Sequence, residues 1–258
     1  MVNKSRLLEG PQRGVSNPDE MVGDYTSPIL KAQAAEAVKR FGEIELSGAA
    51  AATPSNQCWP QPVPYIFQYN VGIQILQQPH QITILYNYDH EVRHVRMNQG
   101  HPAQAIPSWY GDSVAHYEGG TLVIDTVGIK ADRPFAIVDA FGTPYSSALH
   151  VVERYSLLEY EDAKDALSRN AKENFDLNEV SALPVYVDPN YRGKHLQLRL
   201  TVEDEGVSTG PWSATITYRR GFNWRGSEEW PEVVCAENIH EYYALKDSQV
   251  PQAAKPDF

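Results

Sequence analysis

The chain has 258 residues and a formal net charge of −11, from 33 acidic and 22 basic side chains. A chain of this length can bury one substantial core, and β-barrels of this size are often single domains. The acidic balance, without a dense Lys/Arg cluster, argues against nucleic acid or an anionic membrane surface as a partner. No apolar run is long enough for a transmembrane helix. We therefore expect a soluble protein with a small-molecule ligand.

Residues 1–57 are predicted to form an N-terminal arm that ends in a helix. Residues 1–30 lack the features of a signal peptide, so the sequence reads as cytoplasmic, or as secreted or periplasmic if a leader has been removed. Ser27 can serve as N-cap with Pro28 in the first turn, and Ile29–Phe41 carries an apolar stripe before Gly42. An arm of this length also favours a homo-oligomer.

From Cys58 onward the pattern is one of strands and turns. Tyr65–Gln77 alternates as a strand pair interrupted at Gly72, and the next two strands form a hairpin turned at 89–91. The later expected strands are Gln81–Tyr88, Val92–Met97, Thr121–Val127, Leu149–Leu157, His195–Val202, Trp212–Tyr218 and Val233–Cys235. Antiparallel strands without a βαβ rhythm predict a mainly all-β fold, a single lipocalin-like antiparallel β-barrel.

One segment interrupts this pattern. Glu159–Asp176 has high helix propensity and is predicted to be a surface helix inserted between two strands. We therefore place the barrel domain at 58–245 with an insertion at 159–194, followed by a C-terminal tail at 246–258.

The stretch Pro107–Gly128 combines a polar, turn-rich half with a dense strand. Within that strand Asp125 lies between Val123 and Val127 on one face of a period-2 pattern. A carboxylate on an apolar row must be paired or must face a polar lumen. Asp125 is therefore either a hydrogen-bonded structural acid or a residue that faces a ligand.

This stretch resembles a bacterial family of largely uncharacterised β-rich proteins, many of them secreted. The family pattern is Trp-x-Gly-(Asp/His)-Ser followed by Trp-Glu-Gly-Asp-Thr-Leu-Val-Val-Asp-Thr. The chain matches it at Trp109, Gly111, Asp112, Ser113, Glu118, Gly119, Thr121, Leu122, Val123, Asp125 and Thr126. It departs at Tyr117 and Gly120, and it has Tyr145, Ser146 and Ser147 where the family shows His-Ser-Glu. The resemblance spans about Cys58–Asn238 and implies a barrel-like fold, but no single activity.

The two cysteines, Cys58 and Cys235, are too sparse for a disulfide scaffold. In a reducing compartment they would be free buried thiols, which is the interpretation that we favour. Both lie in segments that resemble the family, so a disulfide between them is the alternative.

Charged residues in two strands suggest acid–base chemistry. In the segments VRHVRM and HVVERY, alternation sends ionisable groups to both faces, so at least one must face inward. An inward Arg93 would pair with Asp125, Asp112 or Glu118 and could hold a ligand oxygen, or it would form a structural ion pair that closes the barrel. An imidazole would move the proton and a carboxylate would orient it. The candidate catalytic residues are Arg93, Asp112, His116, Asp125 and His150.

Aromatic side chains are the candidates for ligand binding, and a tyrosine hydroxyl can also donate a proton. They are Tyr86, Tyr88, Trp109, Tyr110 and Tyr145. The histidines lack the spacing of a metal site, and no phosphate loop, dinucleotide fingerprint or nucleophile elbow is present. We expect neither a metal nor an organic cofactor.

Two functions fit this sequence. The first is a cofactor-independent lyase, dehydratase or isomerase that acts by acid–base chemistry on a small aromatic or polycyclic molecule in the barrel lumen. The alternative is a non-catalytic, lipocalin-like binding protein for a hydrophobic small molecule. A catalytic lumen should contain an imidazole and a carboxylate within hydrogen-bonding reach, whereas a carrier should have a mainly apolar lumen.

Overall fold

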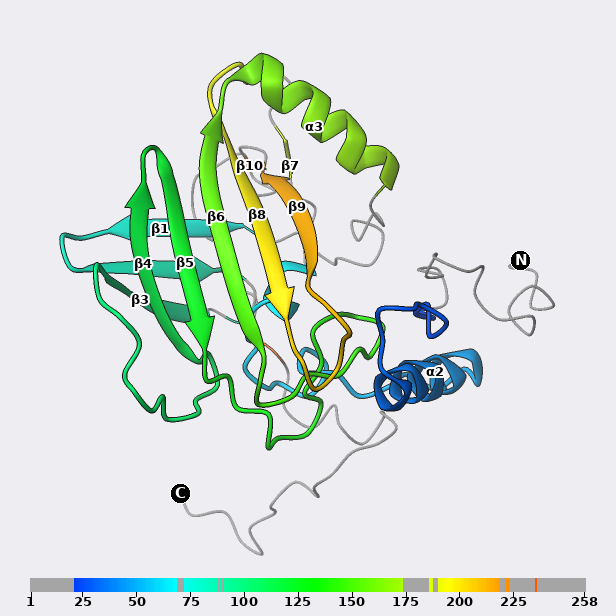
Figure 1. Cartoon of the computed structure of the whole chain (residues 1–258). Helices are drawn as coiled ribbons and strands as arrows, with labels where there is room; N and C mark the ends of the chain where they lie inside the picture. Colours follow the sequence, from blue (N-terminus) through cyan, green and yellow to red (C-terminus); the bar gives the residue numbers. More distant parts are fainter. Residues whose placement is uncertain are drawn as a thin grey trace, which may run out of the picture.

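The protein is mostly β-structure, arranged as one curled sheet (Figure 1). The structure, a computed structural model, describes residues 21–68, 72–87, 89, 91–173, 186–187, 190–218, 221–222 and 235. Eight strands follow the order β1-β2-β3-β4-β5-β6-β8-β9. Their bounds are β1 Ile73–Gln77, β2 Gln81–Tyr86, β3 Val92–Met97, β4 Asp112–Glu118, β5 Thr121–Val127, β6 His150–Leu158, β8 His195–Glu203 and β9 Trp212–Tyr218.

The sheet curls into a half-barrel, so the predicted closed barrel is wrong. In Figure 1, β1 to β3 run across the direction of β4 to β9, and β1 and β9 lie at the two ends of the strand order. The prediction of a purely antiparallel sheet is also wrong, because β3 pairs with β4 in parallel. The long connection 98–111 makes this possible, since parallel neighbours need a crossover rather than a tight turn.

Most predicted strands are confirmed, with shifted ends. Strand periodicity correctly located β2, β3, β5, β6, β8 and β9. The strand pair predicted at Tyr65–Gln77 is half wrong, because Tyr65–Gln68 forms a short 3-10 helix (η2) and only Ile73–Gln77 is a strand. β4 was not predicted, because its residues fall in the turn-rich half of Pro107–Gly128. Most of the strand expected at Val233–Cys235 lies outside the described residues.

The N-terminal helix begins later and runs further than its sequence signals predict. α2 spans Ala32–Leu46, with Lys31 as N-cap, while Leu30 forms a β-bridge with Ser208 instead of entering the helix. Gly42 does not end α2 but lies inside the helix, where it is buried. A Cβ at this glycine would approach Val22 Cγ1 to 3.1 Å, so the small residue permits close packing there.

The inserted helix is confirmed as α3, Tyr160–Glu173, which lies at the opposite end of the sheet from α2 (Figure 1). Two short strands, β7 Tyr186–Val187 and β10 Gly221–Phe222, pair outside the main sheet. No helix in the described residues is long and apolar enough to cross a membrane.

The core lies on the concave face of the sheet. Its central strands contribute Ile84 from β2, Val95 from β3, Ile124 from β5, Val151 from β6 and Leu198 from β8, none of which is measurably exposed. The burial patterns of β2 and β3 alternate with period two, as expected for strands with one covered face. Side chains between these core positions therefore point to the convex face.

Cys58 and Cys235 form a disulfide across 177 residues of sequence. The favoured prediction of free thiols is therefore wrong, and the alternative is correct. Spacing could not decide the point, because a disulfide requires proximity in space, which the fold alone supplies. The bond ties the distant Cys235 to the segment that enters the sheet.

Candidate functional site

The five predicted catalytic residues lie on opposite faces of the sheet. Arg93 is buried on the concave face with the core residues of β3. Asp112, His116, Asp125 and His150 belong to the other face and are at least partly exposed. The strand pairing fixes this division, because Asp125 lies opposite Val114 while its neighbour Thr126 lies opposite Ser113. The five side chains therefore do not meet in one site.

Arg93 pairs inside the core with an acid that the sequence analysis did not choose. Its Nη2 lies 2.6 Å from Glu153 Oε1, and its Nη1 lies 3.1 Å from Glu153 Oε2. The same guanidinium donates to Ser113 Oγ and to Thr126 Oγ1. Tyr155 donates its hydroxyl to Glu153 Oε2 at 2.9 Å. The predicted pairing of Arg93 with Asp125, Asp112 or Glu118 is wrong.

This buried pair fixes the charge of the guanidinium. Burial by itself lowers the pKa of Arg93, but the attraction of Glu153 outweighs it and raises the pKa above its ordinary value. Each guanidinium nitrogen of Arg93 donates to an acceptor in Ser113, Thr126 or Glu153. Such a satisfied pair is suited to holding the strands together rather than to binding a ligand.

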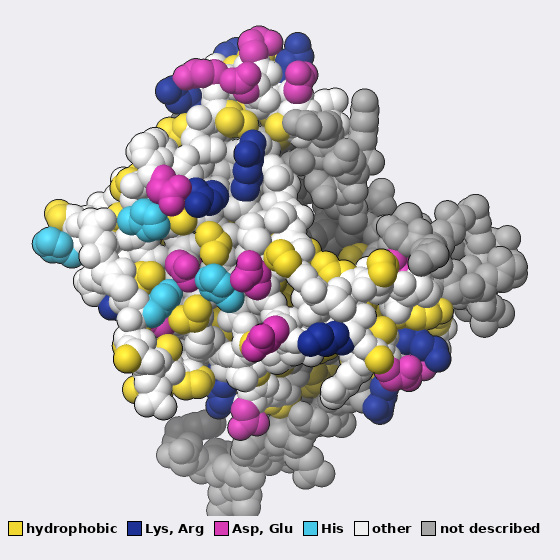
Figure 2. Space-filling view, in the orientation of Figure 1, with side chains coloured by type: hydrophobic (Ala, Val, Ile, Leu, Met, Phe, Trp, Pro, Cys, Tyr) yellow, Lys and Arg dark blue, Asp and Glu magenta, His cyan; other side chains and the backbone are white. Residues whose placement is uncertain are grey.

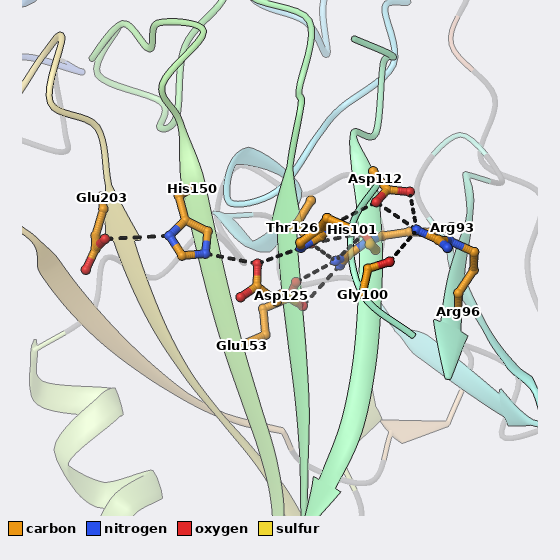
Figure 3. A network of polar contacts seen from close by, with 11 residues as sticks. Arg93, Arg96, Gly100, His101, Asp112, Asp125, Thr126, His150, Glu153 and Glu203 are labelled. Carbon is orange, nitrogen blue, oxygen red and sulfur yellow. Dashed lines mark hydrogen bonds and ion pairs between the residues drawn. The ribbon is translucent and has the colours of Figure 1, made fainter. Parts of the chain in front are cut away.

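The convex face carries a chain of alternating carboxylates and imidazoles (Figure 3). His101 Nδ1 lies 2.7 Å from Asp112 Oδ2, and its Nε2 lies 3.0 Å from Asp125 Oδ1. His150 Nε2 approaches the same Asp125 oxygen to 2.9 Å, and Arg96 pairs with Asp112. In Figure 2, histidine and acidic side chains gather on this face. The predicted acid–base residues Asp112, Asp125 and His150 thus meet through His101.

His101 must carry two protons to make both of its bonds, because carboxylates only accept hydrogen bonds. Partial burial lowers the pKa of His101, but the hydrogen bonds to Asp112 and Asp125 outweigh it and raise the pKa above the usual value. The pKa of Asp112 is lowered, since hydrogen bonds from His101 and Arg96 outweigh its burial. These imidazoles and carboxylates therefore form a charged network, the His101 network, that fastens the 98–111 connection to the sheet.

His116 lies at the exposed end of β4, away from this chain. Its Nε2 is 3.1 Å from Glu118 Oε1, and Arg154 Nη1 is 2.6 Å from Glu118 Oε2. All three side chains are about half exposed. In the described part of the chain, no group of three or more His, Cys, Asp or Glu side chains is arranged to hold a metal ion.

A different cluster, which we call the Glu91 site, lies where the segment after Cys58 meets the start of β3. Its members are Gln61, Tyr86, Glu91, Tyr110 and Arg133. The backbone N–H of Gln61 donates to Glu91 Oε1 at 2.8 Å, and Arg133 Nη1 donates to the carbonyl of Pro60 at 2.9 Å. These contacts bring three separate chain segments together.

Several buried atoms of the Glu91 site have no hydrogen-bond partner among the described residues. They are Gln61 Nε2 and Oε1, Glu91 Oε2 and Arg133 Nη2, together with Tyr86 Oη, which lies beside the Arg93 guanidinium. Gln61 is 0% exposed and Glu91 is 7% exposed. Buried polar atoms are almost always paired in folded proteins, because an unpaired one costs about 1–3 kcal/mol. Such a concentration of unpaired donors and acceptors is typical of a place that receives water or a ligand.

Glu91 is the group with the most unusual ionisation in this site. Burial raises the pKa of Glu91 to about 8, against a smaller opposing effect of the Gln61 N–H. The charge of Asp89 adds to the rise, while the charge of Arg133 and a contact with the Tyr110 hydroxyl lower the pKa, although no described donor meets Glu91 Oε2 with full hydrogen-bond geometry. Burial also raises the pKa of Tyr110 and, to about 12, that of Tyr86. Near neutral pH the site therefore presents a protonated carboxyl group and neutral phenols.

Aromatic rings and a cation border the Glu91 site. Trp59 and Trp109 meet edge to face with ring centroids 5.2 Å apart. The Arg133 guanidinium lies 4.5 Å from the Trp109 centroid and 5.7 Å from that of Trp59. Tyr145 donates its hydroxyl to the Lys130 carbonyl and lies near Arg133. These rings flank the unpaired Arg133 nitrogen with flat apolar surface.

Four of the five aromatic residues predicted to bind a ligand therefore belong to the Glu91 site or its border. They are Tyr86, Trp109, Tyr110 and Tyr145. Tyr88 lies outside the described residues. Their role in binding stays a prediction.

Gln61, Glu91, Arg133 and Trp59 were not among the site residues predicted from the sequence. Glu91 could have been found, because period-2 alternation extended back from Arg93 puts both side chains on one face. We assigned it to the hairpin turn instead. Gln61 and Arg133 lie in irregular, proline-flanked segments, where no periodicity indicates the direction of a side chain.

Comparison with known proteins adds no family assignment. No protein-family model, curated protein or solved structure matches the chain. The family resemblance of Pro107–Gly128 and the later segments stays a prediction, and the Glu91 site must be judged by its own chemistry.

Proposed function

We propose that the protein is a cofactor-independent acid–base enzyme, a lyase, dehydratase or isomerase, that acts on a small aromatic or polycyclic molecule at the Glu91 site. The observation that carries this proposal is the state of Glu91, which is 7% exposed, has an unpaired Oε2 and has a pKa raised to about 8. Perturbed acids beside convergent polar groups mark many catalytic sites.

Each member of the site has a role in this proposal. A carboxyl group with a pKa near the working pH can both give and take a proton, so Glu91, protonated near neutral pH, would give its proton to one position of a conjugated system and then, as the carboxylate, would remove a proton from another position. Tyr110 lies beside Glu91 and would donate to the carbonyl oxygen as negative charge develops there. Arg133 would hold an anionic oxygen elsewhere on the substrate. Trp59 and Trp109, which contact each other edge to face, would offer ring surface to the planar substrate.

The alternative is a lipocalin-like binding protein, and one observation favours it. The Gln61 side chain is completely buried, and neither of its polar atoms has a partner among the described residues. An amide placed in this way can anchor a ligand without taking part in a reaction. The two functions differ in whether Glu91 transfers a proton.

The test is proton exchange from solvent. The protein is incubated in D₂O with a panel of phenolic and polycyclic ketones and alcohols, and mass spectrometry records deuterium uptake, loss of water or isomer formation. We expect turnover by the unmodified protein and a loss of about 100-fold or more in Glu91→Gln, the usual range for a general acid–base group. Glu118→Gln, on the convex face, is the matched control and should react normally. Equal rates for Glu91→Gln and the unmodified protein would exclude the catalytic role, and binding without any turnover would favour the carrier.

We also propose, from the sequence alone, that the chain forms a homo-oligomer. Light scattering on the purified protein tests this, and a monomer at working concentration would contradict it.

A further inference from the structure

Arg133, which is half-buried, differs from the fully buried Arg93 in what it leaves unpaired. Every guanidinium nitrogen of Arg93 donates to Ser113, Thr126 or Glu153. Arg133 donates Nη1 to Pro60 O at 2.9 Å and Nε to Pro134 O at 3.3 Å. Its buried Nη2 has no acceptor among the described residues. An unpaired guanidinium N–H fits an anionic oxygen, because such charge-assisted bonds are short and strong.

The surroundings of Arg133 favour a ligand that is negatively charged at one end. Lys130 Nζ lies 5.3 Å from the Trp109 ring centroid, so two cations flank the same indole. The nearby acid, Glu91, is held largely neutral by its burial and does not pair with Arg133. This cationic position lies in a chain whose net charge is −11. A negative ligand group would supply the missing counter-charge.

The rest of the site favours a flat body with a second polar group. Trp59 and Trp109 present ring surface beside Arg133, which suits a planar aromatic ring. Gln61 offers both an amide donor and a carbonyl acceptor with no partner among the described residues. A hydroxyl group can accept from one and donate to the other.

We infer that the Glu91 site binds a planar hydroxyaromatic carboxylate, with the carboxylate on Arg133, the ring against Trp59 and Trp109, and the hydroxyl group on Gln61. This inference rests on the proposed function for the location of the site and names the substrate class. It requires binding only, so it can be tested separately from turnover.

The experiment compares an acid with its amide. Binding of 4-hydroxybenzoate, 4-hydroxybenzamide, and the two-ring pair 6-hydroxy-2-naphthoate and its amide is measured by calorimetry and by quenching of tryptophan fluorescence. These pairs have nearly the same shape and differ in charge. We expect at least one acid to bind the unmodified protein about tenfold or more tightly than its amide, the effect of a charge-assisted bond. Equal affinity within both pairs, or no binding by either acid, would overturn the inference.

Variants show which side chain causes the preference for the acid over its amide. Arg133→Met keeps a long apolar side chain and removes the cation, so the preference for the acid should fall about tenfold. Arg154→Met, on the convex face, is the matched control and should keep the preference. An unchanged preference in Arg133→Met would also overturn the inference. If this variant does not fold, the comparison of acid and amide in the unmodified protein still decides the question.

Glu91→Gln separates the two proposals. Glu91→Gln should abolish proton transfer, whereas the comparison of acid and amide in the unmodified protein measures binding alone. Binding without turnover in every protein tested would reject the enzyme and keep the ligand class. Turnover of neutral substrates without any preference for the acids would reject the ligand class and keep the enzyme.

Discussion

Arg93 Nη2 on β3 lies 2.6 Å from Glu153 Oε1 on β6, although two strands separate them in the sheet. In a flat sheet these strands would be about 14 Å apart, from the spacing of about 4.8 Å between neighbours. The side chains can meet because the sheet curls toward them. Ser113 on β4 and Thr126 on β5 accept from the same guanidinium, so the pair joins four strands across the concave face.

Removing one partner of this pair should be costly. Arg93→Met leaves Glu153 buried without its counter-charge, and we expect a loss of about 3–5 kcal/mol in the free energy of unfolding. The double variant Arg93→Met/Glu153→Leu should recover much of this loss, because no buried charge remains. Urea denaturation measures both, with the exposed Arg154→Met as control. A loss in Arg93→Met as small as that in Arg154→Met would show that the pair does not hold the curled sheet together.

The His101 network should make stability depend on pH. Because the folded pKa of His101 is raised above its ordinary value of 6.5, its contribution is complete below that pH and is lost as the pH rises through the folded pKa. The effect should be no more than about 1 kcal/mol, since the network is partly exposed and screened by salt. His101→Gln should flatten the fall in unfolding free energy as the pH rises above 6.5, and His116→Gln, outside the network, is the control. Identical pH profiles for the unmodified protein and His101→Gln would contradict the network.

The disulfide gives a simple chemical prediction. Denatured, unreduced protein should contain no free thiol, since both cysteines of the chain are bonded. Replacing both Cys58 and Cys235 by serine should lower the free energy of unfolding by about 2–4 kcal/mol. Thiol titration and denaturation measure the two effects. Two reactive thiols per denatured chain would restore the prediction of free cysteines.

Ionisation of Glu91 should also make the free energy of unfolding fall as the pH rises, as for His101, but over a different pH range. Its pKa is raised from 4.5 to about 8, so the neutral carboxyl group contributes fully below about pH 4.5, and the contribution is lost as the pH rises to about 8. At about 1.4 kcal/mol per pKa unit, the change amounts to a few kcal/mol. Glu91→Gln cannot ionise and should lose this dependence. A variant that keeps the same decline would show that another group causes it.

Strand periodicity predicted much of this fold and little of its pairing. It placed Asp125 on one face with Val123 and Val127, and it required an inward ionisable group in each of two strands, which are Arg93 and Glu153. It could not tell which face was concave, because both faces of the central strands carry apolar and charged residues. The partner of Arg93 depends on the order and curl of the strands, which alternation within one strand does not contain.

The residues of the Glu91 site could likewise be predicted only in part from the sequence. The aromatic residues Trp109, Tyr110 and Tyr145 were selected from composition, and the structure groups them around Arg133, which no pattern indicated. Arg133 acquires its importance from tertiary contacts with Pro60 and the two indoles. His101 likewise joins Asp112 to Asp125 only because the 98–111 connection folds back onto the sheet. Residues in irregular segments are positioned by the folded neighbours that surround them.

The most direct test of this account is the pKa of Glu91 itself. Carbon-13 NMR of the side-chain carboxyl groups, with the resonance assigned by its absence in Glu91→Gln, follows this one acid as the pH is varied. The account predicts a midpoint of about 8, because the carboxyl group is buried and one of its oxygens has no donor among the described residues. A midpoint near the ordinary value of 4.5 would mean that Glu91 is ionised at neutral pH, and the proposed proton donor would then be wrong.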